Sequence, residues 1–152
     1  MSDLITKIGH RKAVEIIKEF EGLRLGAYLD SVGVPTIGWG TTHYTDGSPV
    51  QLGQTISAER AEELLAHDMH KFEEGIKKHV AIELNDNQDA ALISFCYNLG
   101  LGAFYHSSLL RKINHHDIQE AADELPKWCH AGGHVVGGLV RRRELERQLY
   151  LS

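Results

Sequence analysis

The spacing of apolar residues changes along the chain. Between His10 and Glu21 they recur at helical intervals, and Gly22 follows as a residue that commonly ends helices. From Leu23 to Ser48, closely spaced glycines separate short segments that carry aromatic and β-branched residues. The first pattern predicts an amphipathic helix, and the second predicts a small, tightly turned antiparallel sheet.

After the predicted sheet the pattern becomes helical again. Ser57 can cap a helix that runs to His79 with its apolar residues on one face. A further helical segment begins at Asp86 or Asn87 and ends at Gly100. Apolar residues surround that segment almost completely, which is typical of a buried core helix.

Three more helices and one loop complete the C-terminal part. The helices are expected at residues 107–113, 117–128 and 139–151. Pro126 should kink or end the second of them, because proline cannot donate the backbone hydrogen bond of a helix interior. The glycine-rich segment HAGGHVVGG, residues 130–138, is expected to be a loop.

Together these patterns predict a single α+β domain over residues 1–152. A small sheet lobe would span about residues 22–56, and a larger helical lobe would contain about residues 80–152 and the N-terminal helix. The helix from Ser57 to His79 would join the lobes, since about 23 residues at 1.5 Å each reach roughly 35 Å. A cleft between two such lobes is a common place for a ligand.

Charge and cysteine content exclude several classes of function. The formal net charge is −5, so the chain lacks the basicity that nucleic-acid binding requires, and no nucleic-acid partner is expected. Cys96 and Cys129 are too few for a disulfide framework and are expected to be reduced. No apolar run approaches the roughly 18 residues of a membrane span, so neither a signal peptide nor a membrane anchor is expected.

Two acids and a hydroxyl stand out in the stretch EGLRLGAYLDSVGVPTIGWG. Glu21 ends an apolar helix beside Phe20, so partial burial should raise its pKa and keep it protonated. Asp30 lies in a more polar, glycine-rich turn, where it should stay ionised. One protonated and one ionised carboxyl are the pair that glycoside hydrolysis requires. The spacing alone does not establish this chemistry, because most acid pairs at this separation are solvated surface groups.

The pattern E-x8-D-x5-T, formed by Glu21, Asp30 and Thr36, resembles the catalytic signature of the phage-type lysozymes. Further similar segments follow in the family's order along nearly the whole chain: IKEFEG, PTIGWGTTH, NQDAALISFCYNLGLGAF, LLRKIN, AADELPKW and GLVRRRELERQL. The resemblance implies the lysozyme-like α+β fold. It also implies hydrolysis of the β-1,4 bond between N-acetylmuramic acid and N-acetylglucosamine in bacterial peptidoglycan.

The resemblance assigns a role to each residue of the signature. Glu21 would be the general acid, Asp30 would act on the attacking water or stabilise the positive sugar, and Thr36 would position that water. Similar family members are associated with inversion at the anomeric carbon, which needs carboxyl groups about 6.5 to 9.5 Å apart. The sequence leaves the choice between inversion and retention open.

The resemblance also suggests residues around the acids. Tyr97 and Asn98 fall where the core helix of the family faces the sugar, and they are the candidates for substrate contact. A core role for Tyr97 and a turn role for Asn98 at Gly100 remain alternatives. One arginine in the run Arg141 to Arg143 should pair with Glu21, although such a run is also typical of a solvated helix face.

No metal and no other cofactor is expected. The ten histidines include the adjacent His115 and His116, followed by Asp117, and the pair His130 and His134. Neither group supplies the three or four convergent ligands of a zinc site. The family that the chain resembles uses none.

The expected partner is peptidoglycan, and the expected state is a monomer with an open cleft. In the absence of an apolar anchor the protein should wait in the host cytoplasm until a separate holin gives it access to the cell wall. Two alternatives remain: a lytic transglycosylase, which uses one acid and no hydrolytic water, and a non-catalytic peptidoglycan-binding module. The presence of Glu21, Asp30 and Thr36 together argues against the binding module, and product analysis would identify a transglycosylase.

Overall fold

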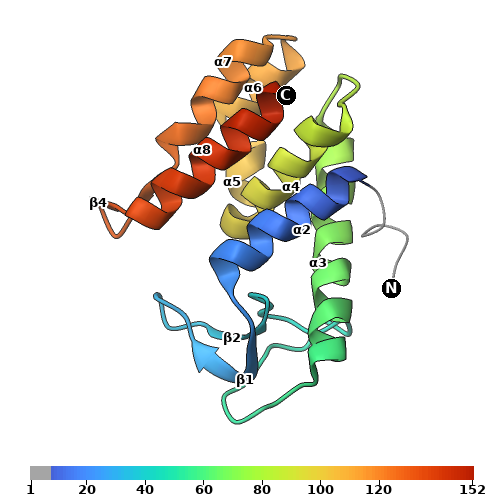
Figure 1. The fold of residues 1–152 in the computed structure, drawn as a ribbon, viewed down its shortest axis with the longest axis vertical. Coiled ribbons are helices and arrows are strands. Elements are labelled where there is room, and N and C mark those ends of the chain that lie inside the picture. Colours follow the sequence, from blue (N-terminus) through green and yellow to red (C-terminus); the bar gives the residue numbers. More distant parts are fainter. Residues whose placement is uncertain (1–7) are drawn as a thin grey trace.

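The computed structural model describes residues 8–152, and its N-terminal part is one helix followed by a small sheet (Figure 1). Helix α2 (Ile8–Glu21) leads into strand β1 (Arg24–Leu29), which pairs antiparallel with β2 (Pro35–Gly38). A long helix, α3 (Ala58–His79), then rises from the sheet alongside the rest of the molecule. The expectation that the chain carries no signal peptide or membrane anchor falls partly on residues 1–7, which lie outside the described residues.

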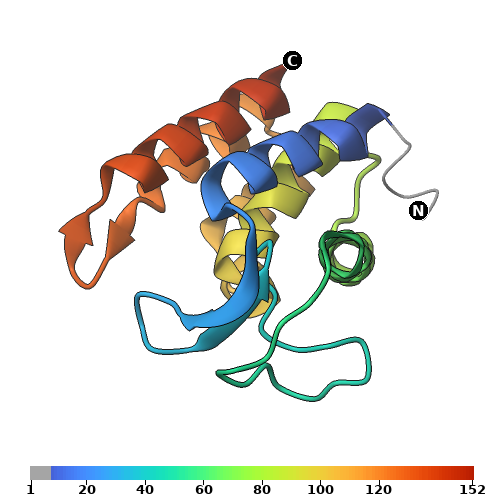
Figure 2. The same ribbon diagram turned by 60° about the horizontal axis from the view of Figure 1, so that its bottom comes forward.

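The remaining elements form the helical part of the fold. In chain order they are α4 (Asp86–Leu99), α5 (Leu101–Tyr105), α6 (Ser108–Asn114), α7 (Ile118–Glu124), the 3-10 helix η1 (Leu125–Lys127), β3 (His130–Ala131), β4 (His134–Val135) and α8 (Gly137–Leu151). Helix α4 packs against α2 on one side and α8 on another, and Figure 2 shows α2 and α8 lying over it. The mixed α+β, lysozyme-like fold expected from the sequence is confirmed.

Side-chain caps account for the starts of α3 and α4. Ser57 accepts a hydrogen bond from the backbone N–H of Arg60 and begins α3. Asn85 and Gln88 cap each other reciprocally at the start of α4. The expected core character of α4 is confirmed, since every side chain from Ala90 to Cys96 is buried.

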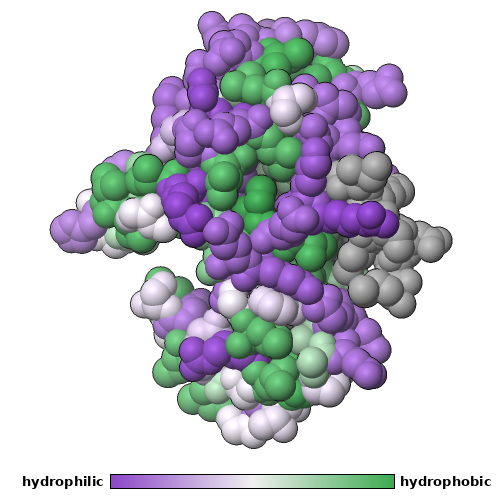
Figure 3. Space-filling model, viewed as in Figure 1, coloured by the Kyte–Doolittle hydropathy of each residue, from purple (hydrophilic) through white to green (hydrophobic). Residues whose placement is uncertain are grey.

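Two hydrophobic clusters stabilise the chain. The larger lies among α2, α3, α4 and the C-terminal helices, and the smaller contains Ile37, Val50 and Leu64 where the sheet meets α3. The boundaries of the two lobes suggested by the sequence stay a prediction. Figure 3 shows the surface indented between the β3–β4 hairpin and the sheet below it, on the left of the view.

Several sequence-based expectations need correction. The segment expected as a loop contains the β3–β4 hairpin, because Gly132 and Gly133 both have positive φ (59° and 81°) and so form the tight turn that joins two strands. The predicted sheet does not continue to Ser48; between Gly38 and α3 only isolated bridges form, such as the one between His43 and Pro49. Helix α5 was not expected from the sequence.

Pro126 ends its helix as expected. Helix α7 stops at Glu124, and proline then lies in the first turn of η1, where no backbone donor is needed. Within residues 8–152, no helix combines the length and the apolar character needed to cross a membrane.

Candidate active site

Glu21 is the last residue of α2, and it faces the arginine run at the start of α8. Its Oε1 lies 3.3 Å from Nη1 of Arg142, which is the arginine that the sequence could not single out. Arg141 instead pairs with Glu19 at 2.7 Å, on the exposed side of α2. Both guanidinium groups also lie over the ring of Phe20, at 4.6 Å for Arg141 and 5.6 Å for Arg142. Glu21 is therefore paired with one buried cation, which also lies against the ring of the neighbouring Phe20.

Behind Glu21 lies a buried ionic cluster that joins α4 to α8. Arg142 donates to the backbone carbonyl of Ser94 at 3.0 Å, and its Nε lies 3.4 Å from Oε2 of Glu146. The Nε of Arg143 lies 2.8 Å from Glu146 Oε1, without the alignment of a hydrogen bond. Glu146 also accepts from the Ser94 hydroxyl at 2.6 Å. Because Arg143 and Glu146 are fully buried, the cluster has a fixed position beneath the acid.

Burial and the arginines act on the proton of Glu21 in opposite directions. Burial raises the pKa of Glu21, and the charge and hydrogen bond of Arg142, followed by the charge of Arg143, lower it. Burial is the larger effect, so the pKa of Glu21 lies above the ordinary value for a glutamate. The expectation of a raised pKa at this helix end is confirmed.

The backbone of Gly40 lies against Glu21 from the side of the sheet. A side-chain carbon built on Gly40 would lie 3.2 Å from Cδ of Glu21 and closer still to its Oε2. Gly40 also has a φ of 97°, which only glycine adopts without strain. Both constraints require glycine at this position, and together they let the chain after β2 close over the carboxyl group.

Asp30 and Thr36 are fixed by the turn that connects β1 to β2. Oδ1 of Asp30 accepts from the backbone N–H groups of Val32 at 2.9 Å and Val34 at 2.8 Å. Thr36 is buried in β2 and donates its hydroxyl to the Val34 carbonyl at 2.9 Å. The same short turn therefore orients the carboxylate and the hydroxyl.

Tyr28 of β1 lies close enough to feel the charges of both acids, and it was not among the site residues predicted from the sequence. It pairs across the sheet with Thr36, and the guanidinium of Arg24 lies 4.4 Å from the centre of its ring. Burial raises the pKa of Tyr28; the charges of Glu21 and Asp30 add to the rise, and Arg24 opposes it. Tyr28 lies two residues before Asp30, and side chains two residues apart in extended chain point to the same side. That spacing was the signal available in the sequence.

Tyr97 and Asn98, at the end of α4, lie on two different parts of this site. The Tyr97 hydroxyl donates to the backbone carbonyl of Trp39 at 2.6 Å, so it joins the core helix to the sheet lobe. Oδ1 of Asn98 accepts from Arg143 at 2.8 Å, which places Asn98 beside the ionic cluster. Contact of either residue with a substrate stays a prediction.

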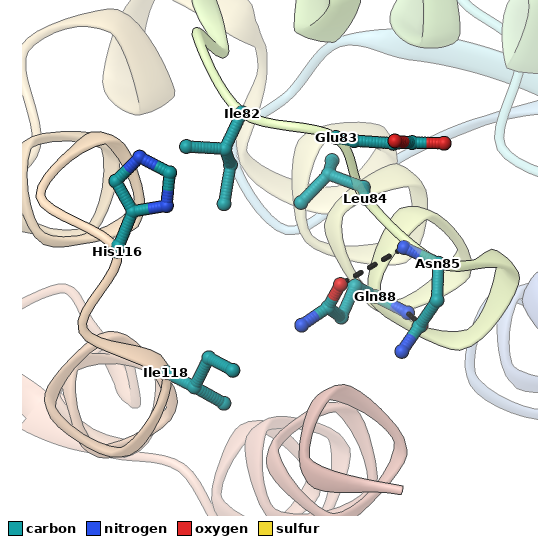
Figure 4. A pocket seen from close by; sticks show the side chains of 7 residues that line it. All are labelled: Ile82, Glu83, Leu84, Asn85, Gln88, His116 and Ile118. Atoms are coloured by element: carbon teal, nitrogen blue, oxygen red, sulfur yellow. Dashed lines mark hydrogen bonds between the residues drawn. The ribbon is translucent and has the colours of Figure 1, made fainter.

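A separate pocket of about 520 Å³ lies away from these residues, between the α3–α4 connection and the loop before α7 (Figure 4). Within it His116 has a φ of 61°, the one positive φ of a non-glycine residue in the described part of the chain. Its lining consists of Ile82, Glu83, Leu84, Asn85, Gln88, His116 and Ile118. It therefore contains none of the catalytic or substrate-binding residues predicted from the sequence.

The histidines that drew attention in the sequence do not form a metal-ligand group. Among the described residues, the one group whose ligand atoms converge is His10, Glu73 and Asp89. Its members come from α2, α3 and α4 and are separated by long stretches of chain, so local spacing could not reveal it.

The raised pKa of Glu21 makes the stability of the fold depend on pH. Glu21 binds its proton more tightly in the folded than in the unfolded chain, so this stabilisation is complete at low pH and is lost as pH rises through the folded-state pKa. Glu21→Gln has no carboxyl group to titrate at this position, so the variant does not lose this stabilisation as the pH rises. Between about pH 3 and pH 7.5, the free energy of unfolding of the variant should rise relative to wild type, by about 1.4 kcal/mol for each unit by which the pKa is raised. Urea denaturation at both pH values measures this difference, and a difference that stays constant or shrinks would contradict the raised pKa.

Several known proteins are similar to this chain in sequence and in fold. A model of the Phage lysozyme family matches residues 18–146. The endolysin of Salmonella phage P22 is 46% identical over 136 residues, which cover 90% of this chain and 92% of that protein. The endolysin of Bacillus phage B103 is 45% identical over 141 residues, covering 91% of this chain and 52% of that protein. The chain spans about half the length of the Bacillus phage relatives that it matches.

A solved structure agrees with the sequence relatives. The endolysin from Escherichia coli O157:H7 phage FAHEc1 has a TM-score of 0.83 at 38% identity, and the match covers 93% of this chain and 92% of that one. The family match extends over both the turn that holds Asp30 and the helix that holds Arg142. The chain therefore belongs to the phage lysozyme family.

Proposed function

We propose that the chain is a muramidase endolysin, which hydrolyses the β-1,4 bond between N-acetylmuramic acid and N-acetylglucosamine in peptidoglycan and so lyses the bacterial host. The observation that carries this proposal is the environment of Glu21. Burial raises the pKa of its carboxyl group, Arg142 lies 3.3 Å from it, and the backbone of Gly40 approaches it from the chain after β2. Membership of the phage lysozyme family supports the same reaction.

Glu21 would donate its proton to the oxygen of the scissile bond. Burial favours the neutral acid before the reaction, and Arg142 and Arg143 stabilise the carboxylate that forms as the proton leaves. The contact from Arg142 to Glu21 is 3.3 Å, longer than a strong charge-assisted hydrogen bond. Arg142 can therefore support the developing charge without holding Glu21 permanently ionised.

Asp30 and Thr36 would hold the attacking water. Oδ1 of Asp30 is engaged by two backbone N–H groups, which leaves Oδ2 to accept the proton of a water. The Thr36 hydroxyl donates its hydrogen to the Val34 carbonyl, so its oxygen can accept a hydrogen bond from the same water. This division of donors and acceptors favours hydrolysis over a transglycosylase reaction, which needs no ordered water.

Asn98 is the better placed of the two proposed substrate contacts. Its Oδ1 accepts from Arg143, so its amide N–H groups face away from that guanidinium and can donate to an oxygen of the sugar. Tyr97 would act by positioning, since its hydroxyl holds the Trp39 carbonyl of the neighbouring lobe.

The setting of the reaction also remains a proposal. We infer that the enzyme acts as a monomer, waits in the host cytoplasm and depends on a separate holin to reach the wall. These expectations rest on the sequence alone. Lysis of cells that carry the gene with and without a holin gene would test the dependence.

The proposed reaction predicts that each acid is needed for its charge or proton and not for its shape. Glu21→Gln and Asp30→Asn keep the size and most hydrogen bonds of the side chains, and each should lower turnover of purified peptidoglycan by about 10² to 10⁴. Both variants should stay folded. Mass analysis of the wild-type digest should show reducing sugar ends, as hydrolysis requires.

Matched controls exist for both variants. Glu19→Gln removes the same charge from the exposed side of α2, and Asp46→Asn alters a carboxylate that caps a similar exposed turn through Ser48. Both controls should keep near-normal turnover. A folded Glu21→Gln or Asp30→Asn enzyme with a tenth or more of wild-type turnover would reject the mechanism, and anhydro-muramic ends would identify a transglycosylase.

Gly40 is predicted to matter through its contact with Glu21. Gly40→Ala adds a carbon that overlaps the Glu21 carboxyl group and should lower turnover at least tenfold. Gly47→Ala is the matched control, because Gly47 has a similar φ of 88° but no atom within 4 Å of the added carbon. Both should lose about 1 to 2 kcal/mol of stability from the left-handed backbone. Turnover assays beside melting curves separate the two effects, and equal turnover in both variants would show that the contact is unimportant.

A further inference from the structure

Three side chains from three helices converge near the beginning of α2, roughly 16 Å along the helix from Glu21. They are His10 of α2, Glu73 of α3 and Asp89 of α4. Nε2 of His10 lies 3.2 Å from Oε2 of Glu73 and 3.5 Å from Oδ2 of Asp89, and all three ligand atoms lie within 4.8 Å of one another. We propose that they bind a divalent transition-metal ion, with zinc as the preferred ion, that fastens α2 to α3 and α4.

The spacing of the ligand atoms fits a tetrahedral ion. With metal–ligand distances of about 2.0 to 2.2 Å, ligand atoms around tetrahedral zinc are roughly 3.3 to 3.5 Å apart. Both contacts of His10 lie close to this separation. Asp89 lies in the first turn of α4 with its side chain 22% exposed, so it can move to complete the third separation.

One hydrogen on Nε2 of His10 cannot make good hydrogen bonds to both carboxylates. If Nε2 of His10 carries a hydrogen, that hydrogen can point at only one of the two carboxylates, and the 3.5 Å contact with Asp89 remains weak. A cation between the three atoms would contact all of them at once. Lys77 supports the arrangement, because its Nζ lies 3.2 Å from the other oxygen of Glu73 and leaves Oε2 directed at His10.

The donor atoms and the burial select the class of ion. One imidazole nitrogen with two carboxylate oxygens suits zinc and similar transition metals, whereas calcium and magnesium prefer oxygen alone. His10 and Glu73 are almost fully buried, and Asp89 opens one side of the group to solvent. That side gives the ion access and allows a water to complete its coordination.

The consequence would be structural and not catalytic. Helix α2 ends at Glu21, and α4 carries Ser94 of the ionic cluster, so an ion that joins their N-terminal parts would hold the two helices in register. This inference goes beyond the proposed hydrolysis and does not depend on it. The competing explanation is a charged imidazole that bridges two acids without any metal.

The test is a titration of metal-stripped protein with zinc chloride at pH 7.5, followed by calorimetry and by melting temperature. We expect one equivalent to bind with micromolar or tighter affinity, and the melting temperature to rise by about 5 to 10 °C at a hundredfold excess over the dissociation constant. Cobalt(II) in place of zinc should give the intense visible absorption of a four- or five-coordinate ion. Absence of saturable binding, or saturation only at millimolar zinc, would overturn the proposal in favour of the metal-free ion pair.

Variants identify the binding group. Asp89→Asn keeps an oxygen that can accept from His10 but weakens the ligand, and Glu73→Gln does the same on the buried side; each should lower zinc affinity at least tenfold. The double variants His115→Asn with His116→Asn, and His130→Asn with His134→Asn, remove the other histidine groups and should bind zinc as wild type does. Binding that survives Asp89→Asn unchanged, or that disappears in either double variant, would assign the metal to the surface histidines and refute the site.

Discussion

Arg142 of α8 lies buried between two carboxylates, Glu21 at the end of α2 and Glu146 one turn further along its own helix. A buried guanidinium needs a compensating charge. Glu146 is fully buried and is held by Ser94 and Arg143, and in its ionised form it supplies that charge; burial raises the pKa of Glu146, and the two arginines and the Ser94 hydroxyl oppose the rise. Glu21 is then not required as a fixed counter-ion. When Glu21 carries its proton, Glu146 still compensates one of the two arginine charges.

Arg142 is paired with both Glu21 and Glu146, and this explains why Glu21 can both hold and donate a proton. With Glu21 neutral, the two arginines and Glu146 leave one net positive charge next to it, and with Glu21 ionised the group is neutral. Burial favours the first state and the positive charge favours the second. The sheet lobe completes the environment from the other side, where Gly40 approaches the carboxyl group without a side chain.

Local patterns predicted much of the fold, and the family pattern predicted the acids. Helical spacing before Gly22 and the cap at Ser57 correspond to α2 and α3 as observed. The hairpin was missed although Gly132-Gly133 is a turn signal, because its strands are only two residues long. The buried cluster was missed for another reason: Arg142 and Glu146 are charged, and charged residues on a helix are usually solvated, so only tertiary packing shows that they face inward. The convergence of His10 with Glu73 and Asp89 likewise depends on three helices meeting.

The proposed reaction depends on the proton of Glu21, and the pKa of this carboxyl group can be measured directly. The resonance of the Glu21 side-chain carboxyl carbon can be followed by ¹³C NMR from about pH 3 to pH 8 in the free protein. Burial against the Arg142–Glu146 pair predicts a midpoint clearly above about 4.3, the ordinary value for a glutamate. A midpoint at or below that value would mean that the arginines outweigh burial, and Glu21 would then be ionised at neutral pH and unable to act as the proton donor.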